Sequence, residues 1–349
     1  MRVFKQSNQR DSLSLIIERP FALVDRQGAP CVAIYGEEEK HIGCIKCANP
    51  RCLFFSEDEL SCDYIQGFPG DRNNEVCPVN AISWTGSSEY PTINNTLCFK
   101  CGVCVLRCPV GALYFTDSSE LAINTDPGDY TETILINDEN LAMQEEQIQS
   151  LLRVPRTGVL MNVSDQVFDE IYSKLFQLRS NIHNMVVRNL LLGLGCKCSI
   201  RRIGDVYSRM DAVYKSSAGS VGAIEVEFGR DTLDASRGIL DDIAVLNTRY
   251  EIYKQNNKAI VVCLQLPNAR QGYWQVIRDI QVVEGIKIGT VTVGALMMAL
   301  WCSCDFEPEN DLYYLDYDNM DLRRAICIQV DCEDIPLSEK KLGILEPMK

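Results

Sequence analysis

The chain has 349 residues, a formal net charge of −14 and a sequence pI of about 4.7. Hydrophobic residues make up 46% of it, enough to bury ordinary cores, so a mainly disordered chain is excluded. At roughly 100–200 residues per domain, we expect two or three domains. No run reaches the roughly 18 consecutive apolar residues of a membrane span, and the first ten residues lack a secretory pattern. We therefore expect a cytoplasmic protein without membrane contact.

The charge and the cysteines narrow the possible classes further. A net anion repels polyanions, so general nucleic-acid binding is disfavoured and any DNA contact would need a local basic face. The 17 cysteines cluster at short, regular spacings in a chain without a secretory signal. This pattern indicates metal binding rather than a disulfide scaffold.

The N-terminal part of the chain divides into three segments. Residues 1–40 predict a β-rich extension, with β-leaning runs around a turn near Gly28. Residues 41–120 hold nine of the 17 cysteines and predict a metal-binding domain. Residues 121–135 are polar and rich in turn residues, which predicts a linker.

Residues 136–305 predict a mixed α/β domain, which makes the expected fold class of the chain α+β or mixed α/β. Ser164 is the expected N-cap of the first helix, and Gly193 and Gly195 end its pattern. The predicted elements are a helix over 165–192, strands around 199–214 and 221–228, a helix over 233–254, and strands over 258–265 and 286–293. Residues 306–349 form an acidic C-terminal extension with little pattern.

The strongest motif is Cys98-Phe-Lys-Cys101-Gly-Val-Cys104-Val-Leu-Arg-Cys108-Pro109, with the spacing C-x2-C-x2-C-x3-C-P. Three closely spaced thiolates can hold three iron corners of one [4Fe–4S] cubane. The fourth cysteine, followed by proline, ligates the other cluster in two-cluster proteins. The motif and the Val110-Gly-Ala-Leu-Tyr-Phe run after it resemble bacterial-type 2[4Fe–4S] ferredoxins.

A second, stretched half of the motif precedes it. It comprises Cys44-Ile-Lys-Cys47-Ala-Asn-Pro-Arg-Cys52 and, after an insertion over 53–76, Cys77-Pro78. The long gap before Cys52 leaves Cys62 as a rival ligand. Zinc is the alternative metal, but four-cysteine zinc sites are built from two separated C-x2-C pairs and fit this spacing poorly. The ferredoxin resemblance implies two clusters, the first held by Cys44, Cys47, Cys52 and Cys108 and the second by Cys98, Cys101, Cys104 and Cys77.

A second candidate site lies on the predicted strand over 221–228. Because side chains alternate along a strand, Glu225 and Glu227 share one face, opposite the apolar residues between them. Adjacent carboxylates on a partly buried strand are costly unless a proton or a cation accompanies them. Asp211 on the preceding strand could complete a set of oxygen ligands suited to Mg²⁺.

This carboxylate pattern resembles the restriction-endonuclease-like superfamily, in which an aspartate precedes a (D/E)-x-K strand and some members carry E-x-E. The resemblance implies a restriction-endonuclease-like domain over 136–305 in which Asp211 and Glu225 bind Mg²⁺. Glu227 would then position or deprotonate the attacking water. The alternative is an ordinary exposed strand face, on which glutamates are common.

Further candidates around this site are weaker. Asp205 shares the face of Asp211 if the predicted strand is regular, which makes it a possible additional ligand. Four arginines close in sequence to the carboxylates are candidates for phosphate contacts, namely Arg201, Arg202, Arg209 and Arg230.

The remaining sequence features give weaker functional signals. No P-loop or G-x-G-x-x-G after a strand supports nucleotide binding. His41 and His183 neighbour no nucleophile in sequence. Seven cysteines lie after the ferredoxin-like segment, and they could form a further metal site or a redox pair, or be buried as small hydrophobic residues. They are Cys196, Cys198, Cys263, Cys302, Cys304, Cys327 and Cys332.

Two functions are compatible with these patterns. We predict a metal-dependent DNA endonuclease of the restriction, phage-defence or repair type, whose ferredoxin-like module is a structural or redox-control element. The alternative is an electron-transfer subunit with a catalytically inactive nuclease-like docking domain, which acidity favours because acidic ferredoxins meet basic partners. The expected partners are DNA and a protein partner or electron donor, with a homodimer as a further option.

Overall fold

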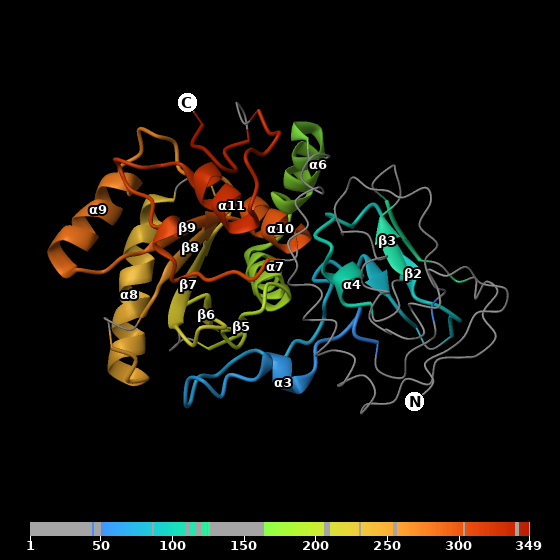
Figure 1. Ribbon diagram of the computed structural model, residues 1–349. Coiled ribbons are helices and arrows are strands. Elements are labelled where there is room, and N and C mark those ends of the chain that lie inside the picture. The colour runs from blue at the N-terminus through green and yellow to red at the C-terminus, as the bar shows by residue number, and fades with distance from the viewer. Residues whose placement is uncertain are drawn as a thin grey trace. The chain divides into compact units, whose positions relative to one another are not determined.

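The computed structural model describes residues 44, 50–85, 87–108, 112–115, 120–123, 125, 164–205, 210–229, 232–253, 257–302, 304–338 and 342–348. They form a mixed α/β structure, as the sequence predicts (Figure 1). Contacts divide the chain into two units. The first comprises described residues within Met1–Phe55, Glu75–Val163 and Trp301–Cys304, and the second those within Ser56–Asn74, Ser164–Leu300 and Asp305–Lys349. None of the described helices combines the length and apolarity needed to cross a bilayer.

The first unit contains two small antiparallel hairpins and a short helix. Its elements are β1 (Ile82–Ser83), β2 (Thr92–Ile93), α4 (Val103–Leu106), β3 (Leu113–Phe115) and β4 (Leu121–Ile123). β1 pairs with β2, and β3 pairs with β4. The linker expected from residue 121 therefore begins with a strand, because β4 completes the hairpin. The N-terminal extension and most of the predicted linker lie outside the described residues.

The second unit is built on a five-stranded sheet in the order β5-β6-β7-β8-β9. β6 pairs antiparallel with both β5 and β7, whereas β7, β8 and β9 run parallel. The interior strand β8, between β7 and β9, is buried along its whole length, as expected for a strand covered on both faces. The strands are β5 (Lys197–Ile200), β6 (Ala212–Lys215), β7 (Val221–Glu227), β8 (Ile260–Cys263) and β9 (Gly289–Thr292).

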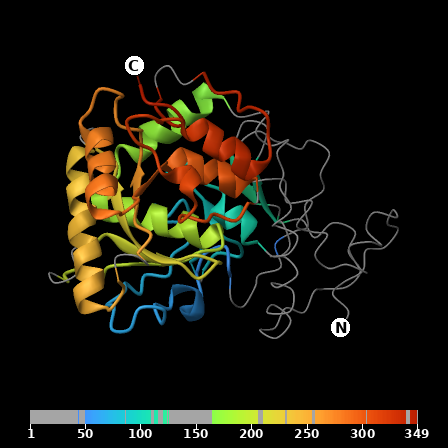
Figure 2. The same cartoon turned by 60° about the vertical axis from the view of Figure 1, so that its left-hand side comes forward.

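Helices cover both faces of this sheet. α8 connects β7 to β8 and α9 connects β8 to β9, so right-handed crossovers in one direction place both helices on the same face. Figures 1 and 2 show α8 and α9 on that face and α7 on the opposite one. The helices of this unit are α3 (Glu57–Leu60), α6 (Asp165–Leu175), α7 (Ser180–Gly193), α8 (Leu233–Arg249), α9 (Tyr273–Glu284), α10 (Val293–Trp301) and α11 (Leu322–Val330), with a 3₁₀ turn at Asp311–Tyr313.

Some predicted elements differ from those observed. The helix expected over 165–192 is two helices, since Arg179 is extended and serves as the N-cap of α7. The strand expected around 199–214 is two strands, β5 and β6, and the described residues 201–205, 210 and 211 lie outside both of them. Predicted β-structure over 286–293 is confirmed for β9 but ends where α10 begins at Val293. α8 ends at Arg249, before the expected residue 254.

Residues 56–74 pack within the second unit, although the sequence places them inside the ferredoxin-like segment. Gly70 forms a β-bridge with Arg201, and the Asp71 amide donates to the Ile200 carbonyl at 2.8 Å. The guanidinium of Arg188, wholly buried on α7, donates to the Asn73 carbonyl at 2.7 Å. The segment thus satisfies backbone groups beside β5.

Candidate functional site

The cysteines of the C-x2-C-x2-C-x3-C-P run lie around α4. Cys98, Cys104 and Cys108 are buried, and the Cys101 carbonyl accepts a hydrogen bond from the Trp301 indole at 3.0 Å. Burial raises the pKa of the Cys101 and Cys104 thiols, and so does the charge of neighbouring cysteines. The neighbours that act on Cys104 are Cys101, Cys98, Cys77 and Cys52.

The two C-P motifs share one local geometry. The Ala81 amide donates to the Cys77 sulfur at 3.1 Å, and the Ala112 amide donates to the Cys108 sulfur at 3.2 Å. In both cases the donor lies four residues after the cysteine, in the repeats Cys77-Pro-Val-Asn-Ala and Cys108-Pro-Val-Gly-Ala. Hydrogen bonds to ligand sulfurs stabilise the thiolate and tune the potential of a cluster.

The backbone between the close cysteines adopts a strained turn. Lys100 has φ +62° and Gly102 has φ +84°, both in the left-handed region. A non-glycine residue in that region costs free energy and persists where the surroundings fix it. This turn leads into α4, whose first residue is Val103, and carries Cys98 and Cys101 on its two sides.

The two rival cysteines of the stretched half-motif have different environments. Cys52 acts electrostatically on Cys104, a member of the motif. The Cys62 thiol instead belongs to the second unit, where it hydrogen-bonds with Ser199 and Tyr64 and has a raised pKa because of burial. Cys44 is half-buried, and Cys47 lies outside the described residues.

Asp211 precedes β6 directly and is held by two donors. The Asn184 amide on α7 donates to Asp211 Oδ1 at 2.9 Å, and the Val226 backbone amide donates to Oδ2 at 3.0 Å. The second bond ties the carboxylate to β7, one residue from Glu225. Asp211 is therefore fixed beside the strand that carries both glutamates.

Glu225 points from β7 toward α8. A Cβ added at Gly238 would lie 2.9 Å from Glu225 Oε1, so the absence of a side chain at Gly238 makes room for this carboxyl group. Glu225 hydrogen-bonds with Asp242 on the same helix. Burial raises the pKa of both groups, and the charge of Asp211 raises it further.

Asp242 is a member of this group that the sequence analysis did not identify. It is only 2% exposed, and its Oδ2 accepts no hydrogen bond from any residue the structure describes. A signal for it exists in the sequence, because Asp242 falls within the apolar stripe of α8 that includes Ile239, Ile243 and Leu246. An acid on the buried stripe of a helix needs a partner.

The other residues predicted for this site differ in whether they act on Glu225 and Asp242. Glu227 adds to the charge around Glu225, and its Oε1 accepts from the Gly229 amide at 2.5 Å. Arg201 acts electrostatically on Asp242 and lowers its pKa. Asp205 and Arg202 follow β5 and are not part of that strand, so no described strand aligns Asp205 with Asp211. Arg209 and Arg230 lie outside the described residues.

His183 borders the site without a catalytic arrangement. Its ring stacks on Phe228 with centroids 4.2 Å apart, and burial lowers its pKa, so the ring is neutral at pH 7. Its Nε2 has no hydrogen-bond partner among the described residues.

Neither group of side chains forms the shell of a single bound ion. Among the described residues, no three His, Cys, Asp or Glu side chains converge as ligands of one metal ion do. The charges of Asp211, Glu225 and Asp242 act on one another, but these side chains do not converge on one point in the structure.

Comparison with known proteins identifies the cysteine region. Residues 74–112 match the 4Fe-4S dicluster domain family. Two uncharacterized ferredoxins of Methanocaldococcus jannaschii are also similar to the chain. MJ0155 is 23% identical over 152 residues, which cover 38% of this chain and 85% of the relative. MJ0265 is 42% identical over 45 residues, which cover 13% of this chain and 26% of the relative. No solved structure matches significantly.

The chain thus contains a ferredoxin-like [4Fe–4S] cluster-binding domain. The described residues fit such a group, because buried thiols that raise one another's pKa need a cation to ionise, and iron supplies that charge. The repeated amide–sulfur hydrogen bonds suit thiolate sulfurs at Cys77 and Cys108.

Proposed function

We propose that this chain is an iron–sulfur protein whose second unit is a divalent-metal-dependent phosphodiesterase acting on DNA. The observation that carries the proposal is the gathering of Asp211, Glu225 and Asp242 from three different elements beside β7. Three carboxyl groups in one partly buried place repel one another, and a bound cation is the usual compensation. Mg²⁺ prefers such oxygen ligands.

The topology of the second unit supports this proposal. The acids lie on β6 and β7 between the helices α7 and α8, and strand β8 follows, which is the order of a helix, two acid-bearing strands, a helix and a strand that the restriction-endonuclease-like resemblance implies. It puts the start of β6 next to the end of β7, where Asp211 accepts from the Val226 amide. Fold alone does not fix activity, so the argument depends on the carboxylates.

The roles of the side chains follow from their surroundings. Asn184 and the Val226 amide orient Asp211, and Glu225 and Asp242, which are hydrogen-bonded to each other, would hold a divalent cation together with Asp211 once they are deprotonated. A divalent cation supplies Lewis-acid polarisation of the phosphate and lowers the pKa of bound water. Glu227, at the more exposed end of β7, is placed to orient or deprotonate the attacking water. Arg201 is the described arginine whose charge reaches this group.

The ferredoxin-like domain is proposed to hold two [4Fe–4S] clusters with the ligand sets given above. The repeated Cys-Pro-Val-x-Ala geometry at Cys77 and Cys108 supports two equivalent half-sites. We assign these clusters a structural or redox-control role.

Cleavage assays test the nuclease proposal. Anaerobically purified full-length protein is incubated with supercoiled and linear DNA, with Mg²⁺, with Mn²⁺ and with EDTA. We expect cleavage that requires the cation, and a loss of about a hundredfold or more in Glu225→Gln and Asp211→Asn, the scale expected when a charge-stabilising group is removed. Glu284→Gln changes an exposed acid of α9 in the same unit and is the matched control.

Two outcomes would contradict the proposal. Cleavage that persists in Glu225→Gln would show that the activity comes from elsewhere or from a contaminant. The second outcome is no cleavage of either DNA form with either cation, by protein that has its full iron content and a native circular dichroism spectrum. This result would rule out phosphodiesterase activity.

Electron transfer is the second candidate, and the names of the M. jannaschii relatives favour it. In this case the clusters pass single electrons to a partner and the carboxylates of the second unit are not catalytic. Its signature is reversible bleaching of the visible absorption by dithionite, together with the paramagnetic resonance signal of a reduced cluster. Clusters that dithionite cannot reduce would argue against this role without affecting the cleavage assay.

A further inference from the structure

Two cysteines meet at the C-terminus of α11, outside both sites described above. The helix ends in a left-handed residue, Asp331, with φ +55° and ψ +52°. This turn directs the Cys332 amide back to the Cys327 carbonyl, to which it donates at 3.0 Å. Such a six-residue closure is the hydrogen-bond pattern of a Schellman motif.

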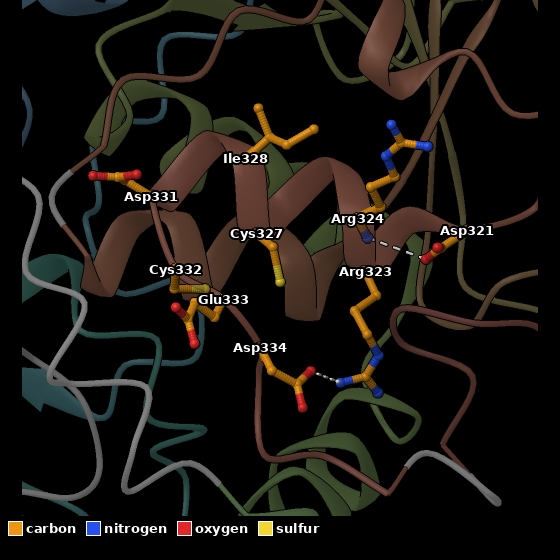
Figure 3. A pocket seen from close by; sticks show the side chains of 9 residues that line it. All are labelled: Asp321, Arg323, Arg324, Cys327, Ile328, Asp331, Cys332, Glu333 and Asp334. Atoms are coloured by element: carbon orange, nitrogen blue, oxygen red, sulfur yellow. Dashed lines mark hydrogen bonds and ion pairs between the residues drawn. The ribbon is translucent and has the colours of Figure 1, made fainter.

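The closure brings the two side chains together. The Cys327 thiol is hydrogen-bonded to the Cys332 sulfur, and both residues are partly exposed. Disulfide partners need Cα atoms within roughly 7 Å of each other, which a direct backbone hydrogen bond between the two residues ensures. Figure 3 shows both thiols on one side of α11, in an open pocket of about 690 Å³.

The other described cysteines of the second unit have different surroundings. Cys196, Cys198 and Cys263 are buried, as is usual for structural thiols, and Cys62 is half-buried and hydrogen-bonds with Ser199 and Tyr64. Cys327 and Cys332 are instead open to a small reagent that enters the pocket.

We propose that Cys327 and Cys332 form a redox-active dithiol that exchanges with small-molecule disulfides, with Cys332 as the attacking thiol. We assign the attack to Cys332 because the hydrogen bond between the two side chains lowers the pKa of Cys332 and raises that of Cys327. Cys327 then acts as the resolving thiol, a division of roles that requires the two thiols to be adjacent.

The charges that face the pair set its rate. Asp331 and Asp334 raise the pKa of Cys332, and burial is the largest cause of its shift. Burial, Cys332 and Asp334 raise the pKa of Cys327 to about 12, and Arg323 lowers it. Because only the thiolate attacks, exchange is slow at neutral pH and accelerates as the pH rises.

The chemistry balances with one disulfide molecule as the oxidant. The Cys332 thiolate attacks RSSR, which forms a mixed disulfide and releases RS⁻. Deprotonated Cys327 then attacks the Cys332 sulfur, forming the Cys327–Cys332 bond and releasing a second RS⁻. Protonation of both leaving groups gives the net reaction: two protein thiols and RSSR become one protein disulfide and two RSH.

The positions of the tryptic cleavage sites allow the oxidation state of Cys327 and Cys332 to be measured separately from that of the cluster cysteines. Trypsin cleavage after Arg324 and Lys340 yields a single peptide, residues 325–340, that contains both thiols and no other cysteine. Full-length protein with intact clusters is incubated anaerobically with glutathione disulfide at about pH 8, quenched with acid and alkylated. Mass spectrometry of this peptide then distinguishes free thiols, a glutathione adduct and an internal disulfide.

We expect the wild-type peptide to lose two hydrogen atoms and to carry no lasting adduct. Cys327→Ser should accumulate glutathione on Cys332, and Cys332→Ser should form an adduct on Cys327 more slowly, because burial and the charge of Asp334 still raise the pKa of that thiol in the variant. Cys263 is the internal control and should stay unmodified. A lasting adduct on wild-type Cys332, or no reaction at either cysteine, would overturn the proposal, and this wild-type result does not depend on the folding of a variant.

Discussion

At the scale of single residues, the surroundings of Cys52 and Cys62 distinguish two candidate cluster ligands that the spacing of the motif does not distinguish. Cys52 adds to the charge felt by Cys104, whereas Cys62 hydrogen-bonds with Ser199 and Tyr64 in the second unit. A thiol engaged with a strand of one unit is not free to bind iron in the other without losing those bonds. We therefore favour Cys52 as the ligand.

The iron content of two serine variants tests this assignment. Cys52→Ser should lose about half of the iron and acid-labile sulfide, because one of two clusters loses a ligand. Cys62→Ser should keep both, since its hydroxyl can retain the hydrogen bonds to Ser199 and Tyr64. Iron loss in Cys62→Ser with full content in Cys52→Ser would reverse the assignment.

The carboxyl pair on β7 and α8 predicts an unusual pH dependence of stability. Burial and neighbouring charge raise the pKa of Glu225 to about 9, against about 4.3 in an unfolded chain. The folded chain therefore holds a proton that the unfolded chain has lost over this range, so stability is greatest at low pH and falls as the pH rises toward 9. Without divalent cation, we expect the thermal unfolding midpoint to fall between about pH 6 and pH 9.

A paired variant checks the cause of that slope. Asp242→Asn removes one negative charge and offers a donor to Glu225, which lowers the pKa of Glu225 and should flatten the slope. Glu284→Gln changes an exposed acid and should leave the slope as in the wild type. A wild-type slope equal to that of Asp242→Asn would mean that other groups cause it.

At the scale of elements, the close approach of β7 to the loop before β8 depends on a glycine. A Cβ added at Gly222 would lie 2.6 Å from the carbonyl carbon of Lys258 and 2.7 Å from the Tyr214 ring. The first obstacle is backbone, which cannot rotate away. Gly222→Ala should therefore destabilise the second unit by about 1–3 kcal/mol, the usual cost of overpacking.

Urea unfolding with and without the substitution measures this cost. Gly272→Ala is the matched control, because its Cβ would meet only Leu233, at 3.8 Å, and its φ of −63° suits alanine. A stability loss at Gly272→Ala equal to that at Gly222→Ala would show that the cost is not steric.

The elements also show what the sequence could and could not predict. β7, β8 and α8 carry strong periodic patterns, and all three were predicted within a few residues. The break between α6 and α7 was not predicted, because the apolar period continues through it, although a turn and bend over 176–178 and the extended backbone of Arg179 interrupt the helix. Asp211, Glu225 and Glu227 follow from strand alternation and a motif. Asp242 could be predicted as a member of the site only once the crossover helix α8 was known to pack on the sheet beside β7.

At the scale of the whole molecule, the two units exchange segments along the chain. Residues 56–74 interrupt the first unit and belong to the second, while Trp301–Cys304 interrupt the second and belong to the first. The 56–74 segment supplies the Asp71 amide to the Ile200 carbonyl and the Tyr64 hydroxyl to the Val213 carbonyl, at 2.8 and 3.2 Å. A cut at residue 164 therefore does not yield a complete second unit.

We expect a fragment of residues 164–349 to be markedly less stable than the same region in the full chain. Removal of 56–74 takes away the carbonyl that Arg188 needs, and a buried guanidinium that loses a hydrogen-bond acceptor costs about 1–3 kcal/mol or more. Thermal unfolding followed by circular dichroism compares the fragment with full-length Cys101→Ser, which has a defective cluster but keeps 56–74. If instability came from iron loss alone, the two would unfold at the same temperature. If the segment matters as its contacts indicate, the fragment unfolds first, and adding a peptide of residues 56–74 raises its midpoint.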